Sequence, residues 1–141
     1  MNCIAVDDEP LALDIIENYV SKHPDLELIA RCNNAADASE VLKNRKVDLM
    51  FLDIQMPEIS GLSFIKSLEQ KPLFIFTTAY PDYALEGFEL DAIDYLLKPI
   101  AYDRFEKSVS KAQEYYKLKS SEDVAETNME EEFIFVKANQ K

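Results

Sequence analysis

The stretch VDLMFLDIQMP, residues 47–57, contains the pattern that decides the fold of this chain. Its apolar residues run with one interruption from Val47 to Leu52 and end at an acidic residue, Asp53. A short apolar run of this kind is typical of a β-strand that is buried on both faces. Such strands belong to parallel sheets covered by helices, so the stretch predicts an α/β fold.

Four further apolar runs of similar length accompany this one along the chain. They span residues 3–6, 26–30, 73–76 and 92–97. Apolar residues recur at helical spacing after Pro10, a residue suited to a first helical turn, and further candidate helices cover 37–44, 62–68, 83–89 and 102–119. This alternation predicts a doubly wound parallel sheet of five strands with five helices.

The alternating pattern ends near Lys119, and we expect one domain over residues 1–119. Residues 120–132 are acidic and lack an apolar stripe, which is typical of a linker. Residues 133–137 return to strand-like composition, but a single strand cannot bury itself. We interpret residues 133–141 as the start of a second domain that is otherwise absent; an extra edge strand or a disordered tail is the alternative.

Composition and charge limit the class of protein. The net charge of -12 repels nucleic acid phosphates, so we expect no DNA binding by this stretch alone. No apolar run is long enough to span a bilayer, and no signal peptide is visible, which predicts a cytoplasmic protein. Cys3 and Cys32 lie in or beside apolar runs, and we expect buried free thiols rather than a disulfide or a metal site.

Polar residues follow the predicted strands at the points where the strands end. Asp7 and Asp8 follow the first strand, and the third, fourth and fifth end at Asp53, Thr78 and Lys98. Ligands of open parallel sheets bind beyond the carboxyl ends of the strands. We therefore expect these five side chains to converge at one edge of the sheet.

Three carboxylates placed together repel one another unless a cation lies between them. Mg²⁺ prefers hard oxygen ligands and commonly lies between carboxylates and a phosphate. We predict that Asp8 and Asp53 bind Mg²⁺ directly, that Asp7 acts through water, and that the backbone carbonyl of Gln55 supplies a further oxygen.

A carboxylate in such a site can act as a nucleophile toward phosphorus. We predict that Asp53 accepts a phosphoryl group, that Lys98 neutralises its charge, and that the Thr78 hydroxyl donates to one of its oxygens. Each residue also has an ordinary interpretation: helix capping for Asp7–Asp8 and Thr78, a turn for Asp53, and a surface lysine for Lys98. Their joint placement at successive strand ends favours the phosphoryl site.

Four motifs resemble the receiver domain of two-component response regulators. They are Val6–Asp7–Asp8–Glu9–Pro10, Leu52–Asp53–Ile54–Gln55–Met56–Pro57 with Gly61, Thr77–Thr78–Ala79, and Asp94–Tyr95–Leu96–Leu97–Lys98–Pro99. The resemblance covers about residues 1–119. It implies a flavodoxin-like sheet of order 2-1-3-4-5, a histidine kinase as phosphoryl donor, and a cis peptide bond at Lys98–Pro99.

The segment from Ala79 to Ile100 is similar to the LytR/AlgR class of response regulators. That resemblance implies a LytTR DNA-binding domain after the acidic linker, and residues 133–137 resemble its opening strand. The chain is therefore expected to regulate transcription only as part of a longer protein.

Family behaviour implies a switch in which a phosphoryl group on Asp53 draws Thr78 inward and Tyr95 rotates to fill the vacated space. The remodelled face would comprise the fourth helix, the fifth strand and the fifth helix, and would support a homodimer. Gln55 and Tyr80 are expected to flank the path of the hydrolytic water, and the bulk of Tyr80 predicts slow loss of the phosphoryl group. The chain would then be a signalling domain and no enzyme beyond its own phosphorylation and dephosphorylation.

Three rival classes share features with this sequence. A phosphatase that uses an aspartyl phosphate normally has a second acid two residues after the nucleophile, where this chain has Gln55. A flavin module would need a phosphate loop rich in Ser, Thr and Gly, and Asp7–Asp8–Glu9 would instead repel phosphate. An interaction module that works without phosphorylation would not need the complete acidic pocket.

Overall fold

A five-stranded parallel sheet forms the centre of the computed structural model, which describes residues 1–83 and 90–132, with side chains over 1–82 and 90–119. The strand order is β2-β1-β3-β4-β5, as the resemblance to receiver domains implied. The strands are β1 Asn2–Val6, β2 Glu27–Cys32, β3 Leu49–Asp53, β4 Leu73–Thr78 and β5 Asp94–Leu97. All five predicted strands are present, with ends shifted by a few residues.

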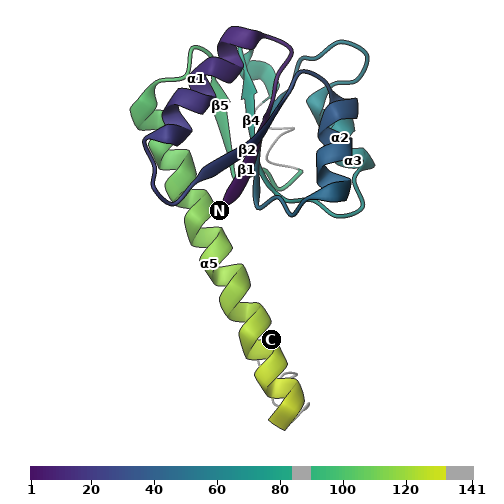
Figure 1. Cartoon of the computed structure of the whole chain (residues 1–141), viewed down its shortest axis with the longest axis vertical. Helices are drawn as coiled ribbons and strands as arrows, with labels where there is room; N and C mark the ends of the chain where they lie inside the picture. Colours follow the sequence, from purple (N-terminus) through teal and green to yellow (C-terminus); the bar gives the residue numbers. More distant parts are fainter. Residues whose placement is uncertain (84–89, 133–141) are drawn as a thin grey trace.

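Helices cover both faces of the sheet (Figure 1). They are α1 Pro10–Ser21, α2 Ala35–Asn44, α3 Gly61–Ser67 and α5 Tyr102–Glu132. Local sequence explains where three of them begin. Pro10 occupies the first turn of α1, the Asn34 side chain accepts the Asp37 N–H at the start of α2, and Ser60 accepts the Ser63 N–H at the start of α3.

The fourth predicted helix, over residues 83–89, falls almost wholly outside the described residues. Only its first residue is described, as the end of a short 3₁₀ turn, η1, Pro81–Tyr83.

The fifth helix is much longer than the sequence predicted. We expected it to end near Lys119, but α5 continues to Glu132 and projects beyond the domain (Figure 1). The prediction was wrong because the loss of an apolar stripe removes tertiary packing, not helix propensity. Residues 120–132 contain neither Gly nor Pro and are rich in Glu, which favours helix. The role of this segment as a linker stays a prediction, and residues 133–141 lie outside the described part.

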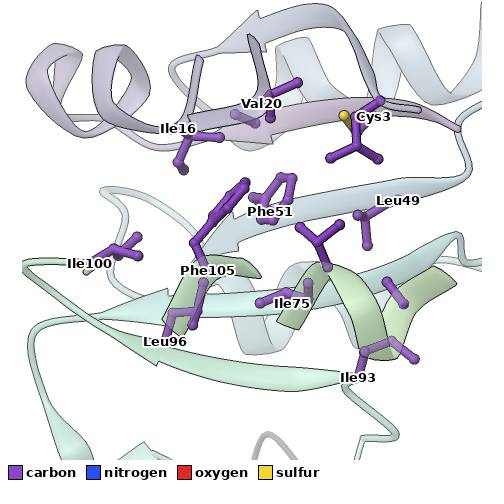
Figure 2. Packing of buried hydrophobic residues seen from close by; sticks show 14 of the residues in the cluster. Cys3, Ile16, Val20, Leu49, Phe51, Ile75, Ile93, Leu96, Ile100 and Phe105 are labelled. Atoms are coloured by element: carbon purple, nitrogen blue, oxygen red, sulfur yellow. The ribbon is translucent and has the colours of Figure 1, made fainter. Parts of the chain in front are cut away.

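Two hydrophobic layers hold the helices against the sheet. On one face, Ile16 and Val20 of α1 and Phe105 of α5 pack against Phe51 and other strand residues, as Figure 2 shows. The rings of Phe51 and Phe105 stack with centroids 5.2 Å apart. On the other face, α2 and α3 cover the alternate residues of the same strands. Each fully buried large apolar side chain contributes about 1.5–3 kcal/mol to folding.

Both cysteines are buried free thiols, as the sequence predicted. Burial raises the pKa of the Cys3 thiol to about 12 and that of the Cys32 thiol to about 11, which makes both unreactive at neutral pH. Among the described helices, none combines the length and the apolar character that a bilayer-spanning segment needs.

Candidate functional site

The carboxyl ends of four strands bring the predicted site residues to one edge of the sheet. The strand register aligns these residues along the sheet. Val6 lies opposite Leu52, so the next residues, Asp7 after β1 and Asp53 at the end of β3, lie side by side. On the next strand, Thr77 lies opposite Asp53, and Thr78 is the last residue of β4.

Three carboxylates form the centre of this edge, which we call the acidic cluster: Asp7, Asp8 and Asp53. One oxygen from each lies within 4.8 Å of the others. Asp7 and Asp53 are buried, whereas Asp8 is exposed. Burial, together with the negative charge of Asp7, raises the pKa of Asp53 to about 7 although Lys98 opposes the shift. The cluster therefore holds more negative charge than its surroundings neutralise.

Lys98 is the cation of the acidic cluster. Its Nζ lies 2.9 Å from Asp7 Oδ2 and 3.6 Å from Asp53 Oδ1, and the side chain is only 16% exposed. Burial would lower the pKa of Lys98, but its contacts with the Asp7 and Glu9 carboxylates outweigh burial and raise it, so the ammonium stays charged. The Lys98–Pro99 peptide bond is cis, as the resemblance implied.

Glu9 also binds this lysine, which the sequence did not reveal. Its Oε1 lies 2.9 Å from Lys98 Nζ, and its backbone N–H donates to Asp7 Oδ1 at 2.9 Å. Glu9 occupies the N-cap position of α1, yet no side chain caps that helix. The capping interpretation of the Asp7–Asp8–Glu9 run is therefore not supported, and Asp7 and Glu9 contact Lys98 instead.

The oxygen set of the acidic cluster fits a hard divalent cation. Asp7 Oδ2 is buried and makes no hydrogen bond within the described part; its 2.9 Å contact with Lys98 is an ion pair without hydrogen-bond geometry. Asp8 and Gln55 line a cavity of about 560 Å³, and the Gln55 backbone N–H donates to Asp53 Oδ1 at 3.2 Å, which places the Gln55 backbone beside Asp53. Among the described residues, the ligand atoms that converge here are carboxylate oxygens, and their negative charge suits Mg²⁺.

A tight loop after β3 supports Asp53. The Gln55 N–H donates to Asp53 Oδ1 at 3.2 Å, and the Gly61 N–H closes the loop on the Ile54 carbonyl at 2.8 Å. A Cβ at position 61 would overlap the Asp53 carbonyl oxygen, so only glycine allows this close approach. The glycine in the sequence motif thus has a geometric reason.

Thr78 and Tyr95 are connected through the backbone of Tyr80. The Thr78 hydroxyl accepts the Tyr80 N–H at 3.2 Å, and the Tyr95 hydroxyl donates to the Tyr80 carbonyl. Tyr95 is already turned inward and only 8% exposed. Thr78 lies beside the acidic cluster in the sheet, but no hydrogen bond joins it to Asp53 in the structure.

A second buried aspartate, Asp94, forms a separate polar cluster that sequence reasoning missed. Arg104 donates two hydrogen bonds to its carboxylate, at 2.7 and 2.8 Å, and Ser108 donates a third at 2.6 Å. Burial would raise the pKa of Asp94, but these bonds lower it to about 2. The sequence feature that could have pointed to Asp94 is its position as the first residue of the Asp94–Pro99 motif, next to Tyr95.

Comparisons with known proteins agree with this geometry. The sequence model of the response regulator receiver domain family matches residues 3–110 of this chain. Over 113 residues, the chain is 40% identical to the transcriptional regulatory protein BtsR of Escherichia coli strain K12, an alignment that covers 79% of this chain and 47% of BtsR. It is 35% identical over 137 residues to the sensory transduction protein LytT of Enterococcus faecalis, covering 95% of this chain and 57% of LytT. The chain spans about half the length of the curated relatives it matches.

Solved structures show the same fold. The response regulatory domain of protein mrkE from Klebsiella pneumoniae superposes with a TM-score of 0.76 at 31% identity, covering 84% of this chain and 99% of that one. The REC domain of AraT from Geobacillus stearothermophilus gives a TM-score of 0.76 at 28% identity, covering 84% and 97%. The predicted resemblance to receiver domains is confirmed, and LytT among the relatives agrees with the LytR/AlgR class.

Proposed function

Because this chain belongs to the response regulator receiver domain family, we propose that it receives a phosphoryl group on Asp53. The observation that carries the proposal is the acidic cluster, in which a buried carboxylate lies 3.6 Å from a partly buried lysine and has its pKa raised by burial and by Asp7. Keeping the Asp53 carboxylate buried beside Asp7 costs folding free energy, and such unfavourable placement is typical of functional sites.

The proposed reaction moves a phosphoryl group from a phosphohistidine of a sensor histidine kinase. An Asp53 carboxylate oxygen attacks phosphorus, the O–P bond forms as the N–P bond breaks, and the imidazole keeps the electron pair and takes up a proton. Lys98 then pairs with a phosphoryl oxygen, and the Thr78 hydroxyl donates to another. Mg²⁺ held by Asp8, Asp53 and the Gln55 carbonyl, with Asp7 through water, would neutralise oxygen charge.

The connection through Tyr80 suggests how the phosphoryl group changes the surface. When the Thr78 hydroxyl turns toward a phosphoryl oxygen, it gives up the Tyr80 N–H, and the backbone of residue 80 is free to move. The Tyr95 hydroxyl is bound to the carbonyl of that same residue, so Tyr95 adjusts with it. Since Tyr95 is already buried, we infer that the change is a shift of this bonded unit rather than a first inward rotation of the ring.

The remaining parts of the proposal follow the family. We infer a cytoplasmic signalling domain rather than an enzyme with its own substrate, and a homodimer through β5, α5 and the segment before β5. A C-terminal LytTR domain would carry DNA binding and transcription regulation in a longer protein. These inferences rest on the resemblance and on relatives named as a transcriptional regulator and a sensory transduction protein.

The proposal is tested by incubating the chain with a small phosphodonor and Mg²⁺ and measuring the intact mass. We expect the wild type to gain one phosphoryl group and Asp53→Asn to gain none. Asp48→Asn is the matched control, because Asp48 lies at the opposite end of β3 and should leave phosphorylation unchanged. Equal phosphorylation of wild type and Asp53→Asn would refute the assignment.

A further inference from the structure

A groove with a basic rim opens at the amino-terminal edge of the sheet, opposite the acidic cluster. It has a volume of about 470 Å³ and lies between the end of α2, the loops before β3 and β4, and α5. Its apolar lining residues are Leu42, Val47, Pro72, Leu73 and Tyr116, and its cations are Arg45, Lys46, Lys71 and Lys119. The groove thus gathers four positive charges in one place, which suits an acidic segment.

The cations of this basic groove are exposed, and none forms an ion pair with another described side chain. Among the described lining residues, Asp48 is the only carboxylate, and its Oδ2 accepts the Asn2 N–H at 2.8 Å. Like charges gathered in a groove repel one another and attract an occupant of opposite charge. The contrast is sharp because the chain as a whole carries a net charge of -12.

The chain itself contains a segment of complementary charge. Residues 120–132 hold Glu122, Asp123, Glu126 and Glu130–Glu132 and neither Lys nor Arg. α5 continues through this segment as one helix and leaves the domain (Figure 1). A helix rises about 1.5 Å per residue, so Glu131 lies roughly 18 Å along the axis beyond Lys119. The end of the segment therefore cannot return to the groove of its own domain.

We propose that the basic groove binds the acidic α5 extension of a second copy of this chain. The two extensions run antiparallel, so that residues 130–132 of each copy lie against Arg45, Lys46, Lys71 and Lys119 of the other. Such an exchange uses the same two surfaces in both copies and closes as a two-fold dimer. It does not depend on phosphorylation of Asp53.

Sedimentation equilibrium of the unphosphorylated chain tests the proposal. At about 10 mM salt, where the Debye length is about 30 Å, we expect a dimer that dissociates at about 1 M salt. Arg45→Glu with Lys71→Glu should weaken it by roughly tenfold or more, and Glu130→Lys with Glu131→Lys should do the same. Lys66→Glu, an exposed lysine on α3 outside the groove, is the control and should leave the dimer unchanged.

Mixing the two double variants provides the decisive arm. The Arg45→Glu/Lys71→Glu variant reverses two charges of the groove and keeps the acidic extension. The Glu130→Lys/Glu131→Lys variant keeps the basic groove and reverses two charges of the extension. A mixture should therefore restore the dimer that each variant alone has lost. A wild-type monomer at low salt, or a mixture that stays monomeric, would overturn the proposal. So would a dimer that survives the groove variant but is lost in Lys107→Glu, which changes a different face of α5.

Discussion

Two buried aspartates, Asp53 and Asp94, are equally hidden from solvent but have opposite electrostatic surroundings. Asp53 is 2% exposed, lies beside Asp7 and shares the single cation Lys98 with two other acids. Asp94 is 1% exposed and receives hydrogen bonds from Arg104, Ser108 and the Tyr95 backbone N–H. As a result, the pKa of Asp53 is raised to about 7 and that of Asp94 is lowered to about 2.

The difference lies in how many donors surround each carboxylate, and it distinguishes a stabilising carboxylate from the phosphoryl acceptor that we propose. A buried carboxylate whose lone pairs are filled by donors stabilises the fold and has little capacity to bind anything else. A buried carboxylate with too few donors is costly to keep and is prepared for a metal ion or a phosphoryl group. Burial alone does not distinguish these cases, because the number and sign of the neighbours decide.

Removal of the Asp94 charge should have the largest effect on stability. Asp94→Asn loses the two charged bonds from Arg104 and should lower the free energy of unfolding by about 2 kcal/mol, less than for a fully buried pair because Arg104 is 44% exposed. Urea denaturation at pH 7 measures this effect. Asp94→Asn should still be phosphorylated on Asp53 at a temperature where the variant is folded. Loss of phosphorylation in the folded variant would contradict the separate roles of the two aspartates.

Mg²⁺ should stabilise the chain through the acidic cluster and not through Asp94. At ten times its Kd, Mg²⁺ should raise the free energy of unfolding by about 1.4 kcal/mol, because it binds the folded state only. The shift should vanish in Asp8→Asn and be unchanged in Asp94→Asn, as thermal melts with and without EDTA would reveal. An equal Mg²⁺ effect in Asp8→Asn would place the ion elsewhere.

The two aspartates should give opposite slopes of stability against pH. The folded pKa of Asp94 lies below its unfolded value near 4, so its contribution is complete above pH 4 and is lost as pH falls toward 2. The folded pKa of Asp53 lies above the unfolded value, so in EDTA stability falls as pH rises from 4 to 7. Each slope should be about 1 kcal/mol per pH unit. Denaturation across this range should lose the second slope in Asp53→Asn and the first in Asp94→Asn.

The smallest effect concerns access of water to the acidic cluster. Tyr80 is 51% exposed, and its backbone N–H donates to the Thr78 hydroxyl at 3.2 Å. Tyr80→Ala should hasten hydrolysis of the Asp53 phosphoryl group roughly two- to fivefold, a change of about 0.4–1 kcal/mol in the barrier. Decay of the phosphorylated mass measures the rate, with exposed Tyr115→Ala on α5 as control. An unchanged or slower rate would show that Tyr80 does not shield the bond.

Sequence reasoning failed where a residue's role depends on a distant neighbour. Glu9 resembled part of a helix start, but its carboxylate binds Lys98, 89 residues away. Asp94 was visible only as part of a motif, because Arg104 and Ser108 reach it from the next helix. The end of α5 was misplaced because polarity was taken as a stop signal, although a helix that has begun can continue through polar residues that include neither Gly nor Pro.

By itself, the sequence determined the five strands, the layers of helices that cover them, and the polar residues that end β1, β3, β4 and β5. Apolar periodicity is a local property, and the carboxyl ends of parallel strands must meet at one edge. Only the tertiary structure decided how each charge is neutralised: Lys98 among too many acids, Asp94 among enough donors, and a basic groove at the far edge. These outcomes depend on distances between side chains far apart in the chain, since electrostatic energies vary with separation and burial.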